Sequence, residues 1–284
     1  MKNIKLLFLS IMLPLFIFNY SCEELLNQEN GDDLSESEVV EGLKTALKVG
    51  TDSSTTMLSV VNGYYGDPLV KIPLPDEAVE LKDQLNTILN EVPVLTDYLN
   101  LDQEFEKVIL SVNRAAEDAA SEAAPIFKNA ITGLSIADAW DILQGTNPAG
   151  TKGTAEAFDS TAATGYFKSV TQPELVDLYA PKIDAALDRD LGLGFSANDA
   201  WFELRSNYNN VIEDPYVAFT LQVAGYELEP LQTESIGEFS TNLALDGLFS
   251  KVAEEEKKIR RNPLEWAATL VGDILERVFS YFDD

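Results

Sequence analysis

The chain has no histidine and one cysteine, and its 48 acidic residues outnumber 20 basic ones, giving a formal net charge of −28. The lack of histidine excludes Ser-His-Asp and Cys-His catalytic arrangements, zinc sites built on histidine and a histidine pH switch. One cysteine excludes an intrachain disulfide and Cys₄ or iron–sulfur sites. Because the negative charge repels phosphate backbones, we expect no nucleic-acid partner.

The N-terminus has the pattern of a bacterial lipoprotein signal. Lys2 and Lys5 precede an apolar run over residues 6–18, and Ser21 stands directly before Cys22. The run is too short to span a bilayer comfortably, whereas a basic start, a short apolar core and a small residue at the cut describe an export signal. Cleavage before a cysteine resembles the lipoprotein class, whose members carry acyl chains on that residue. An ordinary secretory signal and an uncleaved anchor are the alternatives.

This pattern divides the chain and predicts its location. Residues 1–21 are the expected signal peptide, 22–34 an acidic flexible tether, and 35–284 a helical domain. An acylated Cys22 would anchor the domain stably and would not be a free thiol in an oxidising compartment. We therefore expect an outer-membrane lipoprotein of a bacterial cell envelope, facing the periplasm or the cell surface. The acidic residues after Cys22 resemble a surface-sorting signal, with a solvated linker as the alternative.

Helix signals recur through the rest of the 284 residues, of which 45% are hydrophobic. Ser35 and Glu38 fit a capping box, and so do Ser235 with Glu238 and Thr171 with Glu174. Apolar residues at three- and four-residue spacing predict helices over 36–61, 76–91, 102–132, 135–144, 154–169, 172–189, 197–211, 233–261 and 263–281. The predicted fold is an all-α single bundle of about nine helices, with two subdomains divided near 190–200 as an alternative.

Three segments do not fit this helical pattern. Residues 62–75 contain two glycines and three prolines and are predicted to form an extended loop, and 190–196 is a glycine-rich break. Residues 214–230 alternate partly like a strand, so a hairpin or an irregular loop is expected there. Pro125, inside the longest predicted helix, should kink or divide it.

A polar cluster within an alanine-rich stretch is the strongest candidate site. Asn113, Arg114 and Glu117 lie three and four residues apart, so they share one region of the helix surface. A partly buried arginine must find acceptors in the protein or on an anionic ligand. A buried Arg–Glu network, a ligand pocket and a catalytic site remain open. Tyr64 and Tyr65, between glycines, could line the mouth of such a pocket or pack on the bundle.

Two charged segments have simpler interpretations. Glu254–Glu256 precede four basic residues, and favourable four-residue spacings predict a solvated helix face. Asp188, Asp190 and Asp199 suggest a calcium loop, but Leu193 stands where such a loop requires glycine. We therefore predict no metal site and no cofactor.

Several short segments in a fixed order resemble a known family. They are Gly63-Tyr-Tyr-Gly-Asp, Ile72-Pro-Leu-Pro75, Asn113-Arg-Ala-Ala-Glu117, Pro125-Ile-Phe, Ala130-Ile131, Asp138-Ala139, Ile142-Leu-Gln-Gly145, Ala162-Ala-Thr-Gly-Tyr-Phe167, Ala244-Leu-Asp-Gly-Leu-Phe249, Glu255-Glu256, Ile259-Arg260 and Asn262-Pro263. Together they resemble domain-of-unknown-function family four-one-nine-seven, bacterial helical envelope proteins, from about residue 35 to the C-terminus. Glu265-Trp266 departs from that pattern, where a basic residue is usual. The resemblance implies a helical fold, export and frequent lipoprotein signals. The family has no assigned chemistry, so no catalytic residue can be transferred from it.

The sequence favours a non-enzymatic module that binds an envelope protein or a small apolar or anionic ligand, or that has a structural role. The alternative is a hydrolase that acts on an envelope polymer with paired carboxylates, which predicts two acids with perturbed pKa in one cleft. A scaffold that depends on a divalent cation is a third hypothesis. Catalytic residues cannot be assigned from the sequence.

Overall fold

The computed structural model describes residues 34–146, 158–266 and 268–281, and no strand occurs within them. These residues form ten α-helices and two short 3₁₀ helices: α1 Glu36–Leu58, α2 Asp76–Glu91, η1 Pro93–Leu95, α3 Thr96–Leu99, α4 Asp102–Gly133, α5 Ala139–Leu143, α6 Ala162–Leu187, α7 Ala197–Ile212, α8 Pro215–Ala224, α9 Gly237–Arg261, η2 Pro263–Trp266 and α10 Gly272–Phe279. The prediction of an all-α bundle is confirmed. The signal, Cys22 and the tether fall outside the described residues, apart from Leu34.

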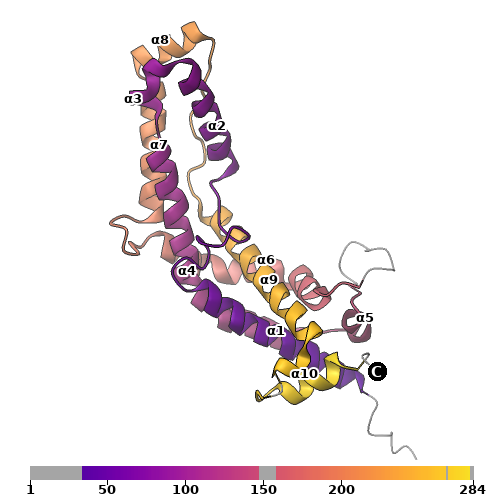
Figure 1. The fold of residues 1–284 in the computed structure, drawn as a ribbon. Coiled ribbons are helices and arrows are strands. Elements are labelled where there is room, and N and C mark those ends of the chain that lie inside the picture. The colour runs from indigo at the N-terminus through magenta and orange to yellow at the C-terminus, as the bar shows by residue number, and fades with distance from the viewer. Residues whose placement is uncertain (1–33, 147–157, 267, 282–284) are drawn as a thin grey trace, which may run out of the picture. The chain divides into compact units, whose positions relative to one another are not determined.

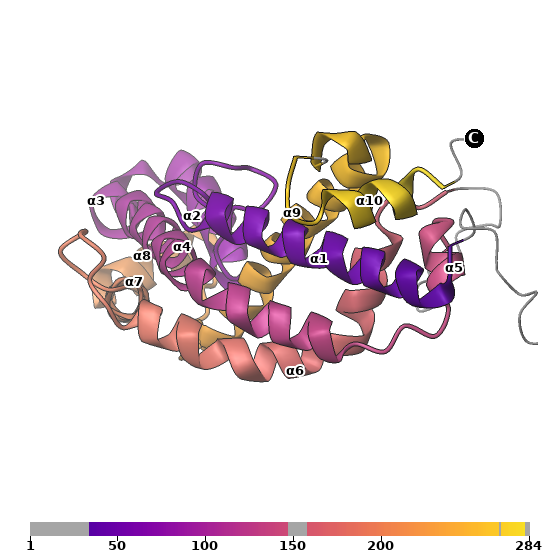
Figure 2. The ribbon, with the colours of Figure 1, turned by 90° about the horizontal axis from the view of Figure 1, so that it is seen from below.

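Four long helices form the central bundle. Helix α1 packs on α4 and α9, and α6 packs on the same two helices from the other side (Figures 1 and 2). Their facing sides are apolar, and three aromatic rings, those of Phe127, Phe167 and Phe249, contact one another in the core. Burial of these stripes supplies most of the stability of such an arrangement.

A second group of helices lies beyond this bundle. Helix α7 packs on α4, and α2, η1, α3 and α8 lie near the outer end of α7 (Figure 1). Residues 35–284 form one compact unit, so the chain on both sides of the glycine-rich break at 190–196 belongs to the same unit. No helix in the described parts of the chain is long and apolar enough to cross a membrane.

Several helix ends follow the predicted capping chemistry. The Ser35 hydroxyl accepts a hydrogen bond from the Glu38 amide, and Glu38 accepts one from the Ser35 amide at 2.8 Å. Hydrogen bonds from Ser35 lower the pKa of the Glu38 carboxyl. Ser196 and Asp199 form an equivalent box at the start of α7, which the sequence analysis did not identify. Such boxes satisfy amides that have no partner within the helix.

Helix α6 corrects one prediction. Separate helices over 154–169 and 172–189 were expected, but α6 runs unbroken past Pro173 and Pro181. The predicted cap Thr171 lies inside it and donates to the Phe167 carbonyl. Every fourth residue from Phe167 to Ile183 is buried, so packing on α4 and α9 outweighs the hydrogen bonds that the prolines remove. Helix α4 likewise passes Pro125 without dividing.

Three further boundaries differ from the predictions. The predicted helix over 263–281 is in fact η2 followed by α10, and the one over 135–144 is only α5. Helix α9 begins at Gly237 and not near 233, because residues 226–236 contain no helix and the Ser235 box does not form. The ambiguous segment 214–230 contains α8, which begins with a side-chain cap from Asp214 and ends at Gly225 in the left-handed conformation.

Candidate functional site

The predicted polar cluster on α4 holds loop 62–75 against the bundle. This loop was predicted to be extended, but turns occupy 62–66 and 68–70, and only 71–75 is free of them. Asn113, fully buried, pairs with both backbone groups of Ile72: its Oδ1 accepts from the Ile72 amide at 2.9 Å, and its Nδ2 donates to the Ile72 carbonyl at 2.8 Å. The side-chain Nδ2 of Asn113 also donates to the Ile109 carbonyl. The side chain therefore takes the place of a strand partner for Ile72.

Glu117 holds the beginning of the same loop. Its Oε1 accepts hydrogen bonds from the consecutive amides of Tyr64 and Tyr65, at 3.2 and 3.0 Å. Its Oε2 accepts from the guanidinium of Arg114, which also donates to Asn62 Oδ1 at 2.9 Å. The side chain of Glu117 is 4% exposed and that of Arg114 is 16% exposed. Burial at this level requires the charge compensation that the pair supplies.

The two tyrosines have different surroundings. Tyr64 is fully buried, and its hydroxyl donates to the Ala244 carbonyl of α9 at 2.7 Å. Burial raises the pKa of the Tyr64 hydroxyl well above its usual value, and nearby Tyr179 and Glu117 add to this. A Cβ at Gly247 would lie 2.7 Å from the Tyr64 ring, so only glycine leaves room for it. Tyr65 is half-buried, with Lys71 Nζ 4.0 Å from its ring centre.

The five predicted residues are thus brought together, but most of their polar groups already have partners within the protein. The loop backbone binds the side chains of Asn113 and Glu117, and the Tyr64 hydroxyl donates to α9. The Arg114 guanidinium donates to Glu117 and Asn62. This is the geometry expected of the buried-network interpretation. The cluster positions the loop, and the outer side of that loop forms a groove.

This groove lies between the loop, α2 and α4, and has a volume of about 380 Å³. Its lining residues are Pro68, Lys71, Pro73, Leu74, Val79, Lys82, Asp83 and Ile109. Lys71 forms no ion pair within the described residues, and Lys82 has only Glu106 at 3.5 Å. The groove therefore combines apolar walls with two ammonium groups, of which only that of Lys82 is in an ion pair among the described residues. Such a composition is typical of small-molecule sites. Sequence analysis missed it because its residues come from three elements.

Two further grooves in the described parts of the chain each have one carboxylate in their lining. One lies between α1 and the segment from η2 to α10, and Asp52 is the carboxylate in its lining. The other lies between α4 and α6, and Glu174 is the carboxylate there. In the groove beside loop 62–75, the carboxylate in the lining is that of Asp83. Each of these three grooves is thus lined by a single carboxylate.

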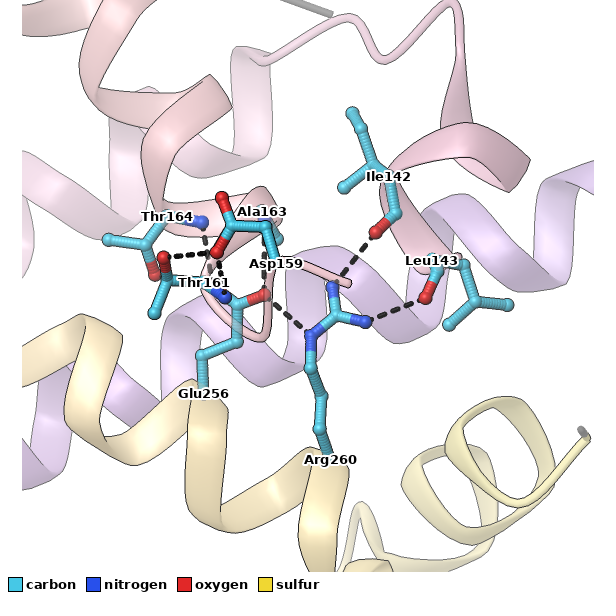
Figure 3. Close-up of polar contacts among 8 residues, drawn as sticks. All are labelled: Ile142, Leu143, Asp159, Thr161, Ala163, Thr164, Glu256 and Arg260. Carbon is cyan, nitrogen blue, oxygen red and sulfur yellow. Dashed lines mark hydrogen bonds and ion pairs between the residues drawn. The ribbon is translucent and has the colours of Figure 1, made fainter. Parts of the chain in front are cut away.

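A second buried ion pair joins α9 to the start of α6 (Figure 3). Glu256 accepts from the amides of Ala163 and Thr164, at 3.0 and 2.8 Å, and from Arg260 Nε at 2.8 Å. Arg260 also donates to the carbonyls of Ile142 and Leu143. The Glu256 side chain is 1% exposed and Glu255 is also buried, so the prediction of a solvated face over 254–256 is wrong for both residues. Local spacing revealed the pair but not its burial.

The non-helical segment 225–236 is held by the same kinds of contact as loop 62–75. Asn209 of α7 pairs with both backbone groups of Leu231, at 2.9 and 3.2 Å. Glu77 of α2 accepts from the consecutive amides of Gln232 and Thr233 and from the Thr233 hydroxyl. Burial raises the pKa of Glu77, but these hydrogen bonds outweigh it, and the net pKa is lowered. Sequence analysis identified neither Asn209 nor Glu77.

The aspartates near the glycine-rich break have local roles. Asp190 Oδ1 accepts from the amides of Gly192, Leu193 and Gly194, which lowers its pKa. Asp199 caps α7. Among the described residues, no group of three or more His, Cys, Asp or Glu side chains is arranged to hold a metal ion.

Comparison with known proteins gives one match. A family model described as "Protein of unknown function (DUF4197)" matches residues 33–280. No curated protein and no solved structure matches the chain. Because the family model covers most of the sequence, including every helix described above, the chain belongs to the DUF4197 family of proteins of unknown function.

Proposed function

We propose that this domain is a non-enzymatic binding module of the bacterial cell envelope, held at the membrane by an acylated Cys22. We further propose that its ligand is a small amphipathic anion, with an apolar chain and one acidic group, bound in the groove between loop 62–75, α2 and α4. The single observation that carries this proposal is the presence of Lys71 and Lys82 in the lining of an apolar groove.

The charge of the chain makes these two lysines informative. In a protein with a net charge of −28, most basic side chains have acidic neighbours. Lys71 has no such neighbour among the described residues and lies over the Tyr65 ring, whereas Lys82 lies 3.5 Å from Glu106 and near the Phe105 ring. An ammonium group held against an aromatic face keeps its positive charge and can still meet an anion. Asp83, also in the lining, would disfavour a ligand with several negative charges.

The walls fit the apolar part of such a ligand. Pro73, Val79 and Ile109 face the groove from three elements, and Val79 is exposed. Asn113 and Glu117 bind backbone groups of loop 62–75, and we call these contacts a clamp. Because the clamp fixes the loop that forms one wall, the groove exists before a ligand binds. Preformed sites bind with a smaller entropic cost.

Calorimetric titration with decanoate tests the proposal, with decan-1-ol and decyltrimethylammonium as neutral and cationic analogues. We expect decanoate to bind most tightly. Lys71→Gln and Lys82→Gln should each weaken it about five-fold, which corresponds to about 1 kcal/mol for a partly exposed charge pair. Lys48→Gln is the matched control, because Lys48 is a half-buried lysine of α1 outside the three grooves. Equal affinity for the three analogues would contradict the proposal.

The grooves favour binding over hydrolysis of a polymer. Glycosidase-type chemistry needs two carboxyl groups on opposite sides of the scissile bond. Each of the three grooves has a single carboxylate in its lining. This observation supports a binding module ahead of the carboxylate-dependent hydrolase.

Membrane attachment has its own test. If Cys22 is acylated, the intact mass of protein extracted from membranes should equal that of residues 22–284 plus the acyl modification. Cys22→Ser should release the protein into the soluble fraction. Retention of Met1, or an unmodified thiol, would refute this part of the proposal and leave the groove untouched.

A further inference from the structure

Helix α8 leaves an apolar surface uncovered at the outer end of the second helix group (Figure 1). Tyr216, Phe219 and Val223 are exposed on one side of α8, at spacings of three and four residues. Tyr98 of α3 extends this surface, since its ring centre lies 5.6 Å from that of Tyr216. We call these four residues the α8 surface.

The helix that carries this surface is firmly anchored. Asp214 accepts hydrogen bonds from the amides of Tyr216 and Val217, at 2.9 and 3.2 Å, and Gly225 ends the helix. Val217 and Leu221 are buried on the opposite side. The α8 surface is therefore not part of the core, because the opposite side of α8 is the one that packs on the protein. Contiguous exposed aromatic residues on a fixed helix mark an interaction site more often than scattered ones do.

The surroundings of the α8 surface carry charge of one sign. Asp97 lies on α3, Glu213 precedes α8, and Glu227 follows it, and all three are exposed. Residues 83–106 and 206–250 contain no lysine or arginine. An acidic border repels anionic lipid headgroups, and it equally repels a second copy of this chain. It attracts a surface bordered by basic residues.

From this complementarity we propose that the α8 surface docks a partner protein through an apolar depression bordered by lysine and arginine. Phe219, which is 64% exposed, is the central anchor, and the acidic residues around it select the partner by charge. This inference uses none of the residues of the ligand groove and stands independently of it.

The probe for this surface is a fluorescently labelled synthetic helical peptide with leucines on one side and lysines on the other. A second peptide carries glutamates in place of the lysines. Fluorescence anisotropy against the folded domain should show that the lysine peptide binds at least ten-fold more tightly. Phe219→Ser should weaken binding about ten-fold, the loss expected when one large apolar anchor no longer contacts its partner.

Phe202→Ser provides the matched control. Phe202 of α7 is equally exposed, at 65%, and lies outside the α8 surface, so its replacement should change affinity less than two-fold. Replacing Asp97 and Glu227 together with lysine should reverse the preference between the two peptides. That reversal depends on charge at the α8 surface and not on the total charge of the protein.

Three outcomes would overturn the proposal. Equal loss of binding for Phe219→Ser and Phe202→Ser would mean that the peptide binds by general charge attraction. Phe219-dependent binding to vesicles of phosphatidylcholine with phosphatidylglycerol would make the α8 surface a membrane contact. Phe219-dependent dimerisation in analytical ultracentrifugation would make the occupant a second copy of this chain.

Discussion

Two non-helical segments, 62–75 and 225–236, are fixed by the same kinds of side-chain contact at different depths. In each, an asparagine pairs with both backbone groups of one residue and a glutamate accepts two consecutive amides. Asn113 and Glu117 do this for loop 62–75 in the interior. Asn209 and Glu77 do it for 225–236 in half-buried positions.

The difference shows what burial adds to a common geometry. In the buried clamp, Glu117 also neutralises Arg114. The Tyr64 side chain of the same loop lies in the core and donates a hydrogen bond to α9. In the half-buried clamp, water can replace a lost contact. Removing a partner should therefore cost much more at loop 62–75 than at 225–236.

The largest difference between the two segments is expected for their glutamates. Glu117→Ala leaves Arg114 without its carboxylate and two amides without an acceptor, so it should lower the free energy of unfolding by about 3–4 kcal/mol. Glu77→Ala should cost about 1 kcal/mol, because its site is closer to water. Urea unfolding followed by circular dichroism measures both. Equal costs would mean that depth does not govern these clamps.

The asparagines offer the same comparison without charge. Asn113→Ala removes three hydrogen bonds from a fully buried position, and we expect a loss of about 2–3 kcal/mol. Asn209→Ala removes two from a half-buried position and should cost about 1 kcal/mol. Thermal unfolding of the two variants under one condition tests the order. A smaller loss for Asn113→Ala would contradict it.

Gly247 tests how tightly loop 62–75 fits on α9. A Cβ there would lie 2.7 Å from the Tyr64 ring and 3.3 Å from Val70 Cβ, so Gly247→Ala should cost about 1–3 kcal/mol. Gly133 is the control, because a Cβ at the end of α4 would meet no atom within 4 Å. Gly133→Ala should be neutral or stabilise by up to about 1 kcal/mol. Chemical denaturation of both variants is the measurement.

Sequence patterns predicted elements whose signals are local. Ser35 with Glu38 marked the start of α1, and the apolar periodicity over 76–91 and 102–132 matched α2 and α4 within one residue. The polar cluster on α4 stood out because Asn113, Arg114 and Glu117 interrupt an alanine-rich stripe.

Features that depend on distant segments could not be predicted. The capping pattern of Thr171 with Glu174 suggested a break in α6, but the buried side of that helix packs continuously on α4 and α9. Glu77 and Asn209 sit in ordinary polar surroundings on separate helices, so nothing near them in the sequence indicates a shared segment. The burial of Glu256 depends on its contact with the start of α6, where its partner Thr164 is 92 residues away in sequence.

The half-buried clamp should also respond to acid. The pKa of Glu77 is lowered below its ordinary value of 4.5 in the folded protein, so the unfolded chain binds a proton more readily. Its contribution is therefore present above about pH 4.5 and is lost as the pH falls through the folded-state pKa. Glu77→Gln should make stability fall less steeply below pH 4.5 than in the wild type. If urea unfolding showed that the stability of both proteins falls equally steeply below pH 4.5, that result would contradict this expectation.

The smallest effects come from two buried tyrosine hydroxyls that differ in one contact. The Tyr64 hydroxyl donates to the Ala244 carbonyl, whereas the Tyr179 hydroxyl has no hydrogen-bond partner within the described residues. Tyr64→Phe should cost about 1 kcal/mol, because it leaves a buried carbonyl with one acceptor site unused. Tyr179→Phe removes a polar group that makes no bond, so it should be neutral or slightly stabilising. Thermal unfolding can resolve this difference, and a clear loss for Tyr179→Phe would mean that its hydroxyl has a partner in solution.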